Sequence, residues 1–388
     1  MSVISGETSE VLDVYQKPLL TDNQQPTTIM AVAVELTHVT KAFDTTLAVN
    51  DVSLKIEQGE FFFLLGPSGC GKSTFLRIVA GFYKPDAGEL RFDDTIMNNV
   101  PPHQRNTGMV FQNYALWPHM SVAENIEYGL TLRKLEKSER SEKITRALEM
   151  VQMEGYRDRA VNTLSGGQQQ RIALARALVI EPSVLLLDEP ISNLDAALRQ
   201  QMREEIKQIH ERTNITMFYV THDQVDALTM ANRMAIMKDG VVVQVGTPRE
   251  VYQFPKNAFV ASFIGETNFI SGKVQQTSNG HTTIETPVGL LHSETVYHEL
   301  STGTPVQCSI RPEALIVDSA QDSSHRAENQ ITAKITAVHY LGRMEEYQLV
   351  AADIPLKAVH YNPGTEIKKA GDTVQLGIAA TAVIPLPN

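Results

Sequence analysis

The stretch Gly66-Pro67-Ser68-Gly69-Cys70-Gly71-Lys72-Ser73-Thr74 decides the fold of this chain. The apolar run 61–65 before it predicts a buried strand, and residues 75–80 after it predict a helix that ends at Gly81. A strand, a glycine-rich loop and a helix in this order are the setting of a phosphate-binding loop. The glycines let backbone N–H groups point at one anion, and the helix N-terminus adds partial positive charge. The alternative is a glycine turn that carries a lysine.

Two residues of this loop and two acidic residues further along predict the chemistry. Lys72 can reach the β- and γ-phosphates of a nucleotide, and the hydroxyl of Ser73 can bind Mg²⁺. Asp188 closes the apolar run 184–187, which is typical of a strand in a parallel sheet. We expect Asp188 to hold Mg²⁺ through water. Neighbours on a strand point to opposite sides, so Glu189 is the candidate base for the attacking water. A plain acidic loop is the alternative.

Three more positions are candidates, and each has a structural alternative. Gln112 could touch both Mg²⁺ and the attacking water, or it is a surface polar residue. His222 follows a predicted strand at 215–220 and could hydrogen-bond the γ-phosphate, or it is structural. Phe43 could stack on a nucleotide base, or it is a core residue.

A second anion site is predicted at Ser165-Gly166-Gly167-Gln168, which opens a helix at 169–178. One nucleotide has only one γ-phosphate, so this second element is expected to serve a nucleotide held by another copy of the chain. A helix cap is the alternative. Asp195 follows at the end of the segment 192–195 and could cross the seam of such a dimer, although a plain turn explains it equally well.

Composition and patterning suggest the overall layout. The chain has 388 residues, a net charge of −11 and two cysteines, which argues against a nucleic-acid surface, a disulfide framework and a cysteine metal cluster. No apolar stretch reaches the roughly 20 residues that span a bilayer, so we expect a soluble chain. Residues 1–33 predict a disordered extension, within which Met30 is an alternative start. Residues 34–264 predict an α/β nucleotide-binding domain with a helical subdomain at about 109–164, and 265–388 a small all-β domain.

The motifs in this order resemble those of the ATP-binding subunit of ABC transporters, and the pentapeptide 164–168 resembles that family's signature. The likeness covers about 34–264. By this resemblance Phe43 is the aromatic that stacks on adenine. The segments 246–248 and 309–313 resemble bacterial importer ATPases that carry a regulatory OB-like (TOBE) domain. Trp117 and Ile191 depart conservatively from the usual pattern.

The resemblance implies a mechanism and partners. Two chains would sandwich two ATP molecules head to tail with Mg²⁺, beneath two membrane permease subunits that a solute-binding protein supplies, at the cytoplasmic face of the inner membrane. One chain would supply Lys72, Ser73, Gln112, Asp188, Glu189 and His222, and the other would supply Ser165, Gly166 and Gly167. Residues 263–269 look closest to polyamine importers, with sugar, iron(III) and phosphonate importers as alternatives. A non-transport ATPase is the alternative of another class, but such proteins usually carry two cassettes or a long coiled coil.

Overall fold

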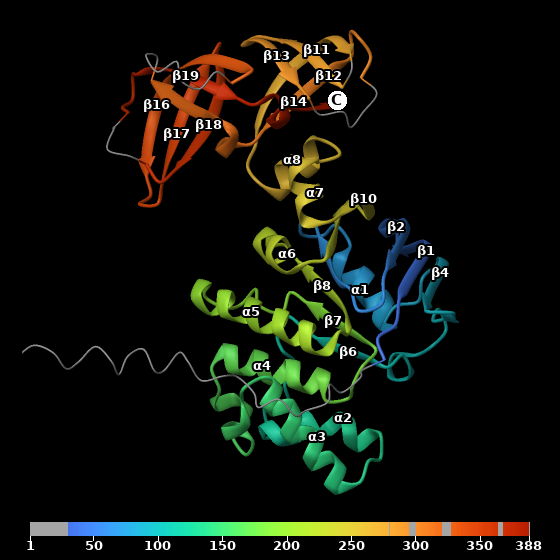
Figure 1. Ribbon diagram of the computed structural model, residues 1–388. Coiled ribbons are helices and arrows are strands. Elements are labelled where there is room, and N and C mark those ends of the chain that lie inside the picture. Colours follow the sequence, from blue (N-terminus) through green and yellow to red (C-terminus); the bar gives the residue numbers. More distant parts are fainter. Residues whose placement is uncertain (1–29, 279, 295–299, 320–326, 364–367, 388) are drawn as a thin grey trace, which may run out of the picture.

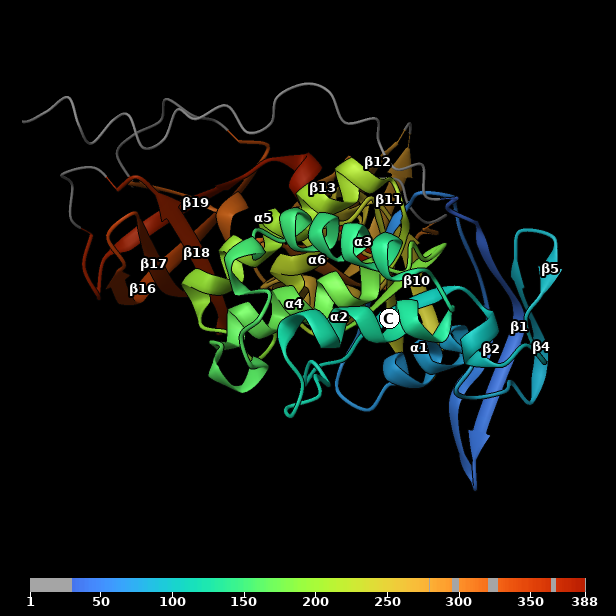
Figure 2. The same ribbon diagram turned by 90° about the horizontal axis from the view of Figure 1, so that it is seen from below.

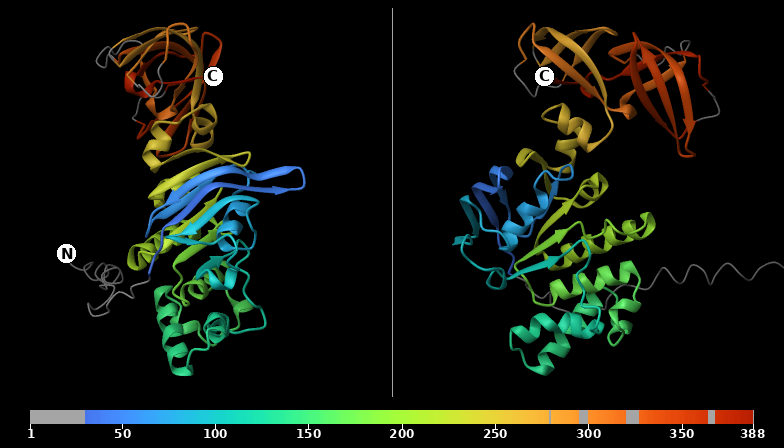
Figure 3. Two further views of the ribbon diagram at one scale, coloured as in Figure 1. Left: turned by 90° about the vertical axis from the view of Figure 1, so that its right-hand side faces the viewer. Right: turned by 180° about the vertical axis from the view of Figure 1, so that it is seen from behind.

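The computed structural model describes residues 30–278, 280–294, 300–319, 327–363 and 368–387. These residues form an α/β unit, a helical part below it and an all-β part above it, as Figure 1 shows. Figure 3 shows the three parts following one another along the length of the molecule, with helices α7 (Pro248–Gln253) and α8 (Ala258–Ile264) between the α/β and all-β parts. The predicted fold class, an α/β phosphate-loop domain followed by an all-β domain, is confirmed.

A six-stranded sheet in the order β10-β9-β3-β8-β7-β6 is the centre of the α/β unit. Its strands are β3 (Phe61–Leu65), β6 (Thr107–Val110), β7 (Val184–Asp188), β8 (Thr216–Thr221), β9 (Arg233–Lys238) and β10 (Val241–Gly246). All neighbouring pairs are parallel except β9–β10. The carboxyl ends of β3, β7 and β8 therefore meet at one edge of the sheet, and the phosphate loop, Glu189 and His222 follow those three ends.

Burial on both faces explains the uninterrupted apolar runs of β3 and β7. Phe61, Phe63 and Leu65 belong to a core shared with helices α2 to α6, whereas Phe62 and Leu64 belong to a core shared with α1. Each fully buried side chain of this size contributes about 1.5–3 kcal/mol relative to exposure. The helices are α1 (Lys72–Ala80), α2 (Val122–Leu132), α3 (Lys137–Met150), α4 (Gly166–Leu178), α5 (Ala196–Thr213) and α6 (Gln224–Met230).

A smaller antiparallel sheet, in the order β2-β1-β4-β5, covers α1 on the side away from the central sheet. Its strands are β1 (Val34–Phe43), β2 (Thr46–Ile56), β4 (Ala87–Phe92) and β5 (Thr95–Ile96). Figure 2 shows this sheet to one side of helices α2 and α3. The packing begins before β1, because Ala31 is buried. Of the extension predicted for 1–33, residues 1–29 lie outside the described residues. Residues 30–33 are described, and Ala31 among them packs into the fold.

The helical part begins later than predicted. Met109 and Val110 end strand β6, which pairs in parallel with β7, so the expected start of the helical subdomain at 109 is wrong. The first helix, α2, begins at Val122 after Ser121, whose side chain and that of Glu124 form a capping box. Met109 and Val110 belong to a strand because β7 offers them a partner, and that partner lies more than 70 residues away in the sequence.

The all-β part consists of two antiparallel five-stranded sheets, ordered β13-β12-β11-β14-β20 and β15-β19-β16-β17-β18. The first contains β11 (Asn268–Ser278), β12 (His281–Thr286), β13 (Gly289–Ser293), β14 (Pro305–Ile310) and β20 (Ile384–Pro387); the second contains β15 (Ile316–Ser319), β16 (Asn329–Tyr340), β17 (Met344–Ala351), β18 (Ile354–Tyr361) and β19 (Thr373–Ile378). One apolar core joins both sheets.

Candidate functional site

The phosphate-binding loop is a cradle that tolerates no side chain at two of its glycines. A Cβ at Gly66 would lie 2.3 Å from the carbonyl oxygen of Met237, and one at Gly71 would lie 1.9 Å from that of Ala48. Gly71 also has φ of +105°, in the region that L-residues avoid. It is the residue before α1, so the free N–H groups at the start of the helix face the loop rather than a capping side chain. Such a helix start attracts an anion.

Lys72 is held over this cradle. Its Nζ donates to the carbonyl oxygens of Gly66 at 2.7 Å and Pro67 at 2.8 Å, and the side chain is buried. Cys70 is buried beside it, and burial raises the pKa of the Cys70 thiol. The loop therefore keeps a positive charge in the position where phosphate oxygens would bind, whereas the cysteine fills space beneath Gly66.

A pocket of about 460 Å³ opens over the loop. It is lined by Thr46, Leu47, Ala48, Ser68, Gly69, Gly71, Lys72, Ser73, Thr74, Glu189, Asp239 and Gly240. Phe43 pairs with Thr46 across the β1–β2 hairpin, so it lies near one wall of the pocket. Phe43 is 41% exposed, its ring centre lies 5.1 Å from that of Tyr83, and Lys41 Nζ lies 5.4 Å from the same ring centre. This exposure excludes the core alternative for Phe43.

Asp188 and Ser73 lie together as predicted. Ser73 Oγ donates to Asp188 Oδ1 at 3.2 Å. Burial raises the pKa of Asp188, and the Ser73 hydroxyl opposes that change. A hydroxyl and a carboxylate next to a phosphate loop are hard oxygen donors of the kind Mg²⁺ prefers, with phosphates and water completing its shell. The pair thus fits a magnesium ion.

The Glu189 side chain contacts two other predicted side chains, those of His222 and Gln112. Its Oε1 lies 3.1 Å from His222 Nδ1, and its Oε2 accepts a hydrogen bond of 3.3 Å from Gln112 Nε2. Glu189 has φ of +45°, an uncommon conformation for a residue with a side chain. Its backbone N–H donates a hydrogen bond of 2.9 Å to the carbonyl oxygen of Val220. The three side chains come from the ends of β7, β8 and β6, which Figure 1 shows side by side.

The predicted second anion site lies at the start of α4 and does not line the phosphate-loop pocket. Ser165 and Gly166 are exposed, and neither lines the phosphate-loop pocket. Gly167 is buried against Leu198, where a Cβ would lie 2.6 Å from a methyl group. Ser165 caps α4 through a capping box with Gln168, whose amide also donates to Tyr156 at 3.1 Å. The cap alternative therefore holds for Ser165 and Gln168, and a contact of the exposed Ser165 and Gly166 with a second copy stays a prediction.

Asp195 also acts as a helix cap. Its Oδ1 accepts from the N–H of Leu198 at 3.0 Å at the start of α5. It is exposed beside Asn193, whose amide donates to the carbonyl of Gln112 at 2.9 Å. The segment 192–195 is therefore anchored to the loop of Gln112, and a contact of Asp195 with a second copy stays a prediction.

Sequence reasoning missed some residues that shape the site. Asp239 and Gly240 form a hairpin turn, and they also line the pocket because Gly240 N donates to the carbonyl of Cys70 at 3.1 Å. Arg176 donates to the carbonyls of Tyr114 and Ala115 and so holds the segment after Gln112. An Asp-Gly pair after a strand signals only a turn, and nothing in the sequence signals its contact with the loop.

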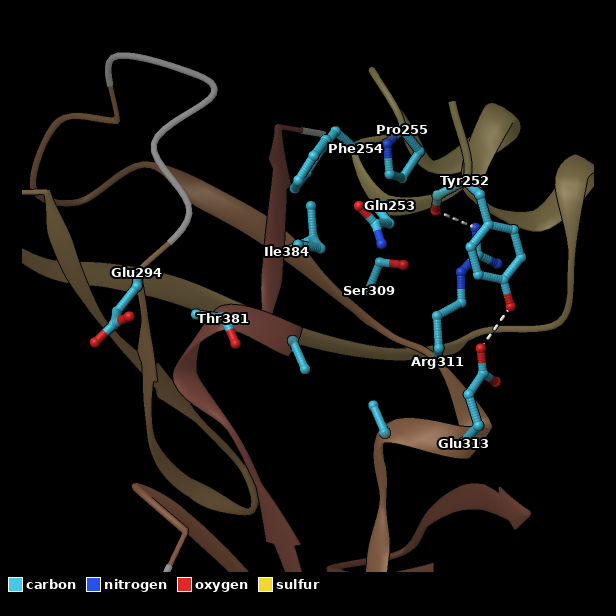
Figure 4. A pocket seen from close by; sticks show the side chains of 12 residues that line it. Tyr252, Gln253, Phe254, Pro255, Glu294, Ser309, Arg311, Glu313, Thr381 and Ile384 are labelled. Atoms are coloured by element: carbon cyan, nitrogen blue, oxygen red, sulfur yellow. Dashed lines mark hydrogen bonds between the residues drawn. The ribbon is translucent and has the colours of Figure 1, made fainter. Parts of the chain in front are cut away.

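A second cavity, of about 750 Å³, lies between α7 and the all-β part (Figure 4). Arg311 crosses its edge: its guanidinium donates to four backbone carbonyls of α7, α8 and the residues after α8, and stacks 4.2 Å from the ring centre of Tyr252. The Tyr252 hydroxyl donates to Glu313 at 2.6 Å; burial and this carboxylate raise the pKa of Tyr252 to about 12. The segment 309–313, singled out in the sequence, therefore joins the two parts of the molecule.

The site defines a nucleoside triphosphatase of the phosphate-loop class. It combines a strand, a glycine loop and a helix with a buried lysine and with the adjacent side chains of Glu189, His222 and Gln112. Family models match residues 49–192 as "ABC transporter" and 308–386 as "TOBE domain". The chain belongs to the family of ABC transporter ATP-binding proteins. It binds and hydrolyses ATP, and the resemblance noted in the sequence is confirmed.

Relatives share most of the chain. The spermidine/putrescine import ATP-binding protein PotA of Rubrobacter xylanophilus is 46% identical over 324 residues, covering 83% of this chain and 84% of the relative. The maltose/maltodextrin import protein MalK of Photorhabdus laumondii is 40% identical over 353 residues, covering 89% and 93%. The Fe(3+) ions import protein FbpC of Fusobacterium nucleatum is 46% identical over 292 residues, covering 75% and 77%.

Solved structures agree for the nucleotide-binding part. The dimeric post-hydrolysis state of the ATP-binding cassette MJ0796, bound to ADP and Pi, is 34% identical with a TM-score of 0.51, covering 56% of this chain and 99% of that chain. Among the residues that the structure describes, no helix is long and apolar enough to cross a membrane.

Proposed function

We propose that this chain powers an importer by hydrolysing ATP at two sites, each built between two copies. One copy would hold ATP with residues 66–74, and the other would cover the γ-phosphate with Ser165, Gly166 and Gly167. The support is geometric: Ser165 and Gly166 are exposed and do not line their own chain's phosphate-loop pocket. A relative of the nucleotide-binding part forms a dimer. Phe43, exposed near the pocket, would stack on adenine.

Glu189 carries the proposal for hydrolysis. It would accept a proton from the attacking water, which His222 and Gln112 help to place, since both side chains already contact its two oxygens. Lys72 would neutralise charge on the phosphates. Ser73, Asp188 and Gln112 would hold Mg²⁺, which supplies charge stabilisation at the transferred phosphoryl group. Asp195 would meet the second copy at the seam.

An exposed aromatic surface suggests the place of a membrane partner. Phe82 is 52% exposed and contacts Phe111, the residue before Gln112. Tyr128 is 42% exposed and contacts Trp117, which lies on the segment that follows Gln112. Monomeric surfaces seldom keep large apolar side chains grouped in this way. We assign this surface to the permease subunits at the cytoplasmic face of the inner membrane, so that movement of Gln112 with bound nucleotide reaches the permease.

Polyamine is the solute best supported, because PotA spermidine/putrescine import proteins from several bacteria are 42–46% identical to this chain. Sugar and iron(III) remain candidates because the MalK relative is 40% identical to this chain and the FbpC relative is 46% identical. Phosphonate import and a non-transport ATPase are the weaker candidates. The test is ATP hydrolysis by this chain assembled with candidate permease and solute-binding proteins from the same genome. Putrescine or spermidine should stimulate hydrolysis, whereas stimulation by maltodextrin or Fe³⁺ alone would overturn the polyamine assignment.

A further inference from the structure

The two neighbours of His222 in the chain share one buried anchor, Asp226. Thr221 Oγ1 donates to Asp226 Oδ2 at 3.1 Å and accepts from the backbone N–H of Asp223 at 2.9 Å. The hydroxyl of Tyr219 donates to the same Asp226 oxygen at 3.3 Å. Asp226 is only 2% exposed, so its carboxylate has protein donors rather than water around it. His222 itself is largely exposed. Thr221 before it bonds Asp226 directly, and Asp223 after it is joined to Asp226 through the Thr221 hydroxyl.

Two arginines of α5 complete the anchor. Arg203 Nε donates to Asp226 Oδ1 at 2.6 Å, and Arg203 Nη2 donates to Asp223 Oδ2 at 3.1 Å. Arg199 lies 3.4 Å from the same Asp223 oxygen and donates to the carbonyl of Leu194 at 3.0 Å. Leu194 directly precedes Asp195. The arginines therefore tie the loop of His222 to the loop that begins α5.

The arrangement favours a fixed geometry over added stability. A buried ion pair is weak evidence for stability, because the cost of removing two charges from water offsets most of their attraction. The ion pair does fix the relative orientation of Asp223 and Asp226, because the planar guanidinium of Arg203 can donate to both carboxylates only in this arrangement. The residues that it orients flank His222, whose Nδ1 lies 3.1 Å from Glu189 Oε1.

We propose that Asp226 and Arg203 are positioning residues for ATP hydrolysis, holding His222 against Glu189 and keeping its loop in register with the start of α5. This inference rests on the proposed role of His222. Neither residue lines the phosphate-loop pocket, so the proposal places their effect on turnover and not on nucleotide binding.

A double-mutant cycle tests the proposal on the full-length chain assembled with its membrane subunits. Asp226→Asn should lower kcat about 10- to 100-fold, the scale of a small misplacement of a catalytic group, with KM for ATP within about twofold. In a His222→Ala background the same change should lower kcat less than about twofold, because the group it positions is gone. Glu60→Gln is the matched control: Glu60 forms a partly buried pair with Arg233 at the opposite edge of the sheet, and this variant should keep its kcat.

Equal loss from Asp226→Asn in both backgrounds would overturn the proposal, as would an equal loss in Glu60→Gln, since either result describes general damage to the fold. If Asp226→Asn does not fold, Arg203→Lys replaces it in the cycle, because lysine keeps the charge but cannot serve Asp223 and Asp226 from one plane. Additive losses for Arg203→Lys and His222→Ala would then overturn the proposal. The parent role is tested separately: a His222→Ala variant with wild-type kcat would refute the role of His222 itself.

Discussion

Replacing Gly71 with alanine tests the geometry of the phosphate loop, and Gly69 supplies its control. Both have positive φ, +105° and +81°, so alanine at either costs about 1–3 kcal/mol in backbone strain. At Gly69 a Cβ meets nothing within 4 Å, so strain is the whole cost. At Gly71 the Cβ would lie 1.9 Å from the backbone oxygen of Ala48, and strand β2 and the loop must separate. Overpacking of this kind costs about 1–3 kcal/mol more.

The comparison uses two measurements. Urea unfolding without nucleotide should find Gly71→Ala less stable than Gly69→Ala by about 1–3 kcal/mol. Titration with a non-hydrolysable ATP analogue should give a Kd raised more than about tenfold in Gly71→Ala relative to Gly69→Ala, because Lys72 moves with the displaced loop. Equal unfolding free energies and equal Kd values for the two variants would refute the reasoning.

Further predictions concern the other residues. Glu189→Gln should bind ATP but lose hydrolysis by more than about 100-fold and run as a stable dimer with ATP on a sizing column; normal turnover would remove Glu189 from its role. Ser165→Arg should abolish hydrolysis while a monomer binds ATP as before, and a large loss of monomer affinity would place the site within one chain. Arg311→Ala removes hydrogen bonds to four carbonyls and should destabilise the junction by about 3 kcal/mol or more, seen as faster proteolysis near α8; an unchanged cleavage rate would contradict this. Burial lowers the pKa of His210, so below about pH 6.5 the unfolded chain binds more protons than the folded chain. The free energy of unfolding therefore decreases as the pH is lowered. His210→Gln should reduce this slope by up to about 1.4 kcal/mol per pH unit in urea titrations, and an unchanged slope would refute it.

Most of the central sheet could be predicted because its strands are buried on both faces. The runs 61–65 and 184–187 have no polar interruption, and few other structures tolerate that pattern. These strands end at Leu65, Asp188 and Thr221, so parallel pairing alone brings the loops that follow them together. Glu189, Gln112 and His222 indeed lie together.

Other features depend on contacts that a linear pattern does not carry. Strand β6 exists because β7 pairs with it, and the turn at Asp239 joins the pocket through a hydrogen bond to the phosphate loop. In the all-β part, the sequence predicts the class of fold, but polar strands such as β12 (His281–Thr286) have no clear signal of their own because pairing with neighbouring strands orders them. Gln168 and Asp195 have two compatible uses, as caps within the chain and as contacts outside it, and sequence alone cannot separate them.

Mixing two inactive variants tests most directly whether each ATP lies between two copies. Glu189→Gln and Ser165→Arg are each expected to be inactive. In a mixed dimer one site carries both defects, and the other joins an intact Glu189 from one chain with an intact Ser165 from the other. An equal mixture, exchanged and assembled with the membrane subunits, should therefore recover about a quarter of wild-type ATP hydrolysis, as expected for random pairing in a two-fold dimer. Activity no higher than that of either variant alone would contradict the account.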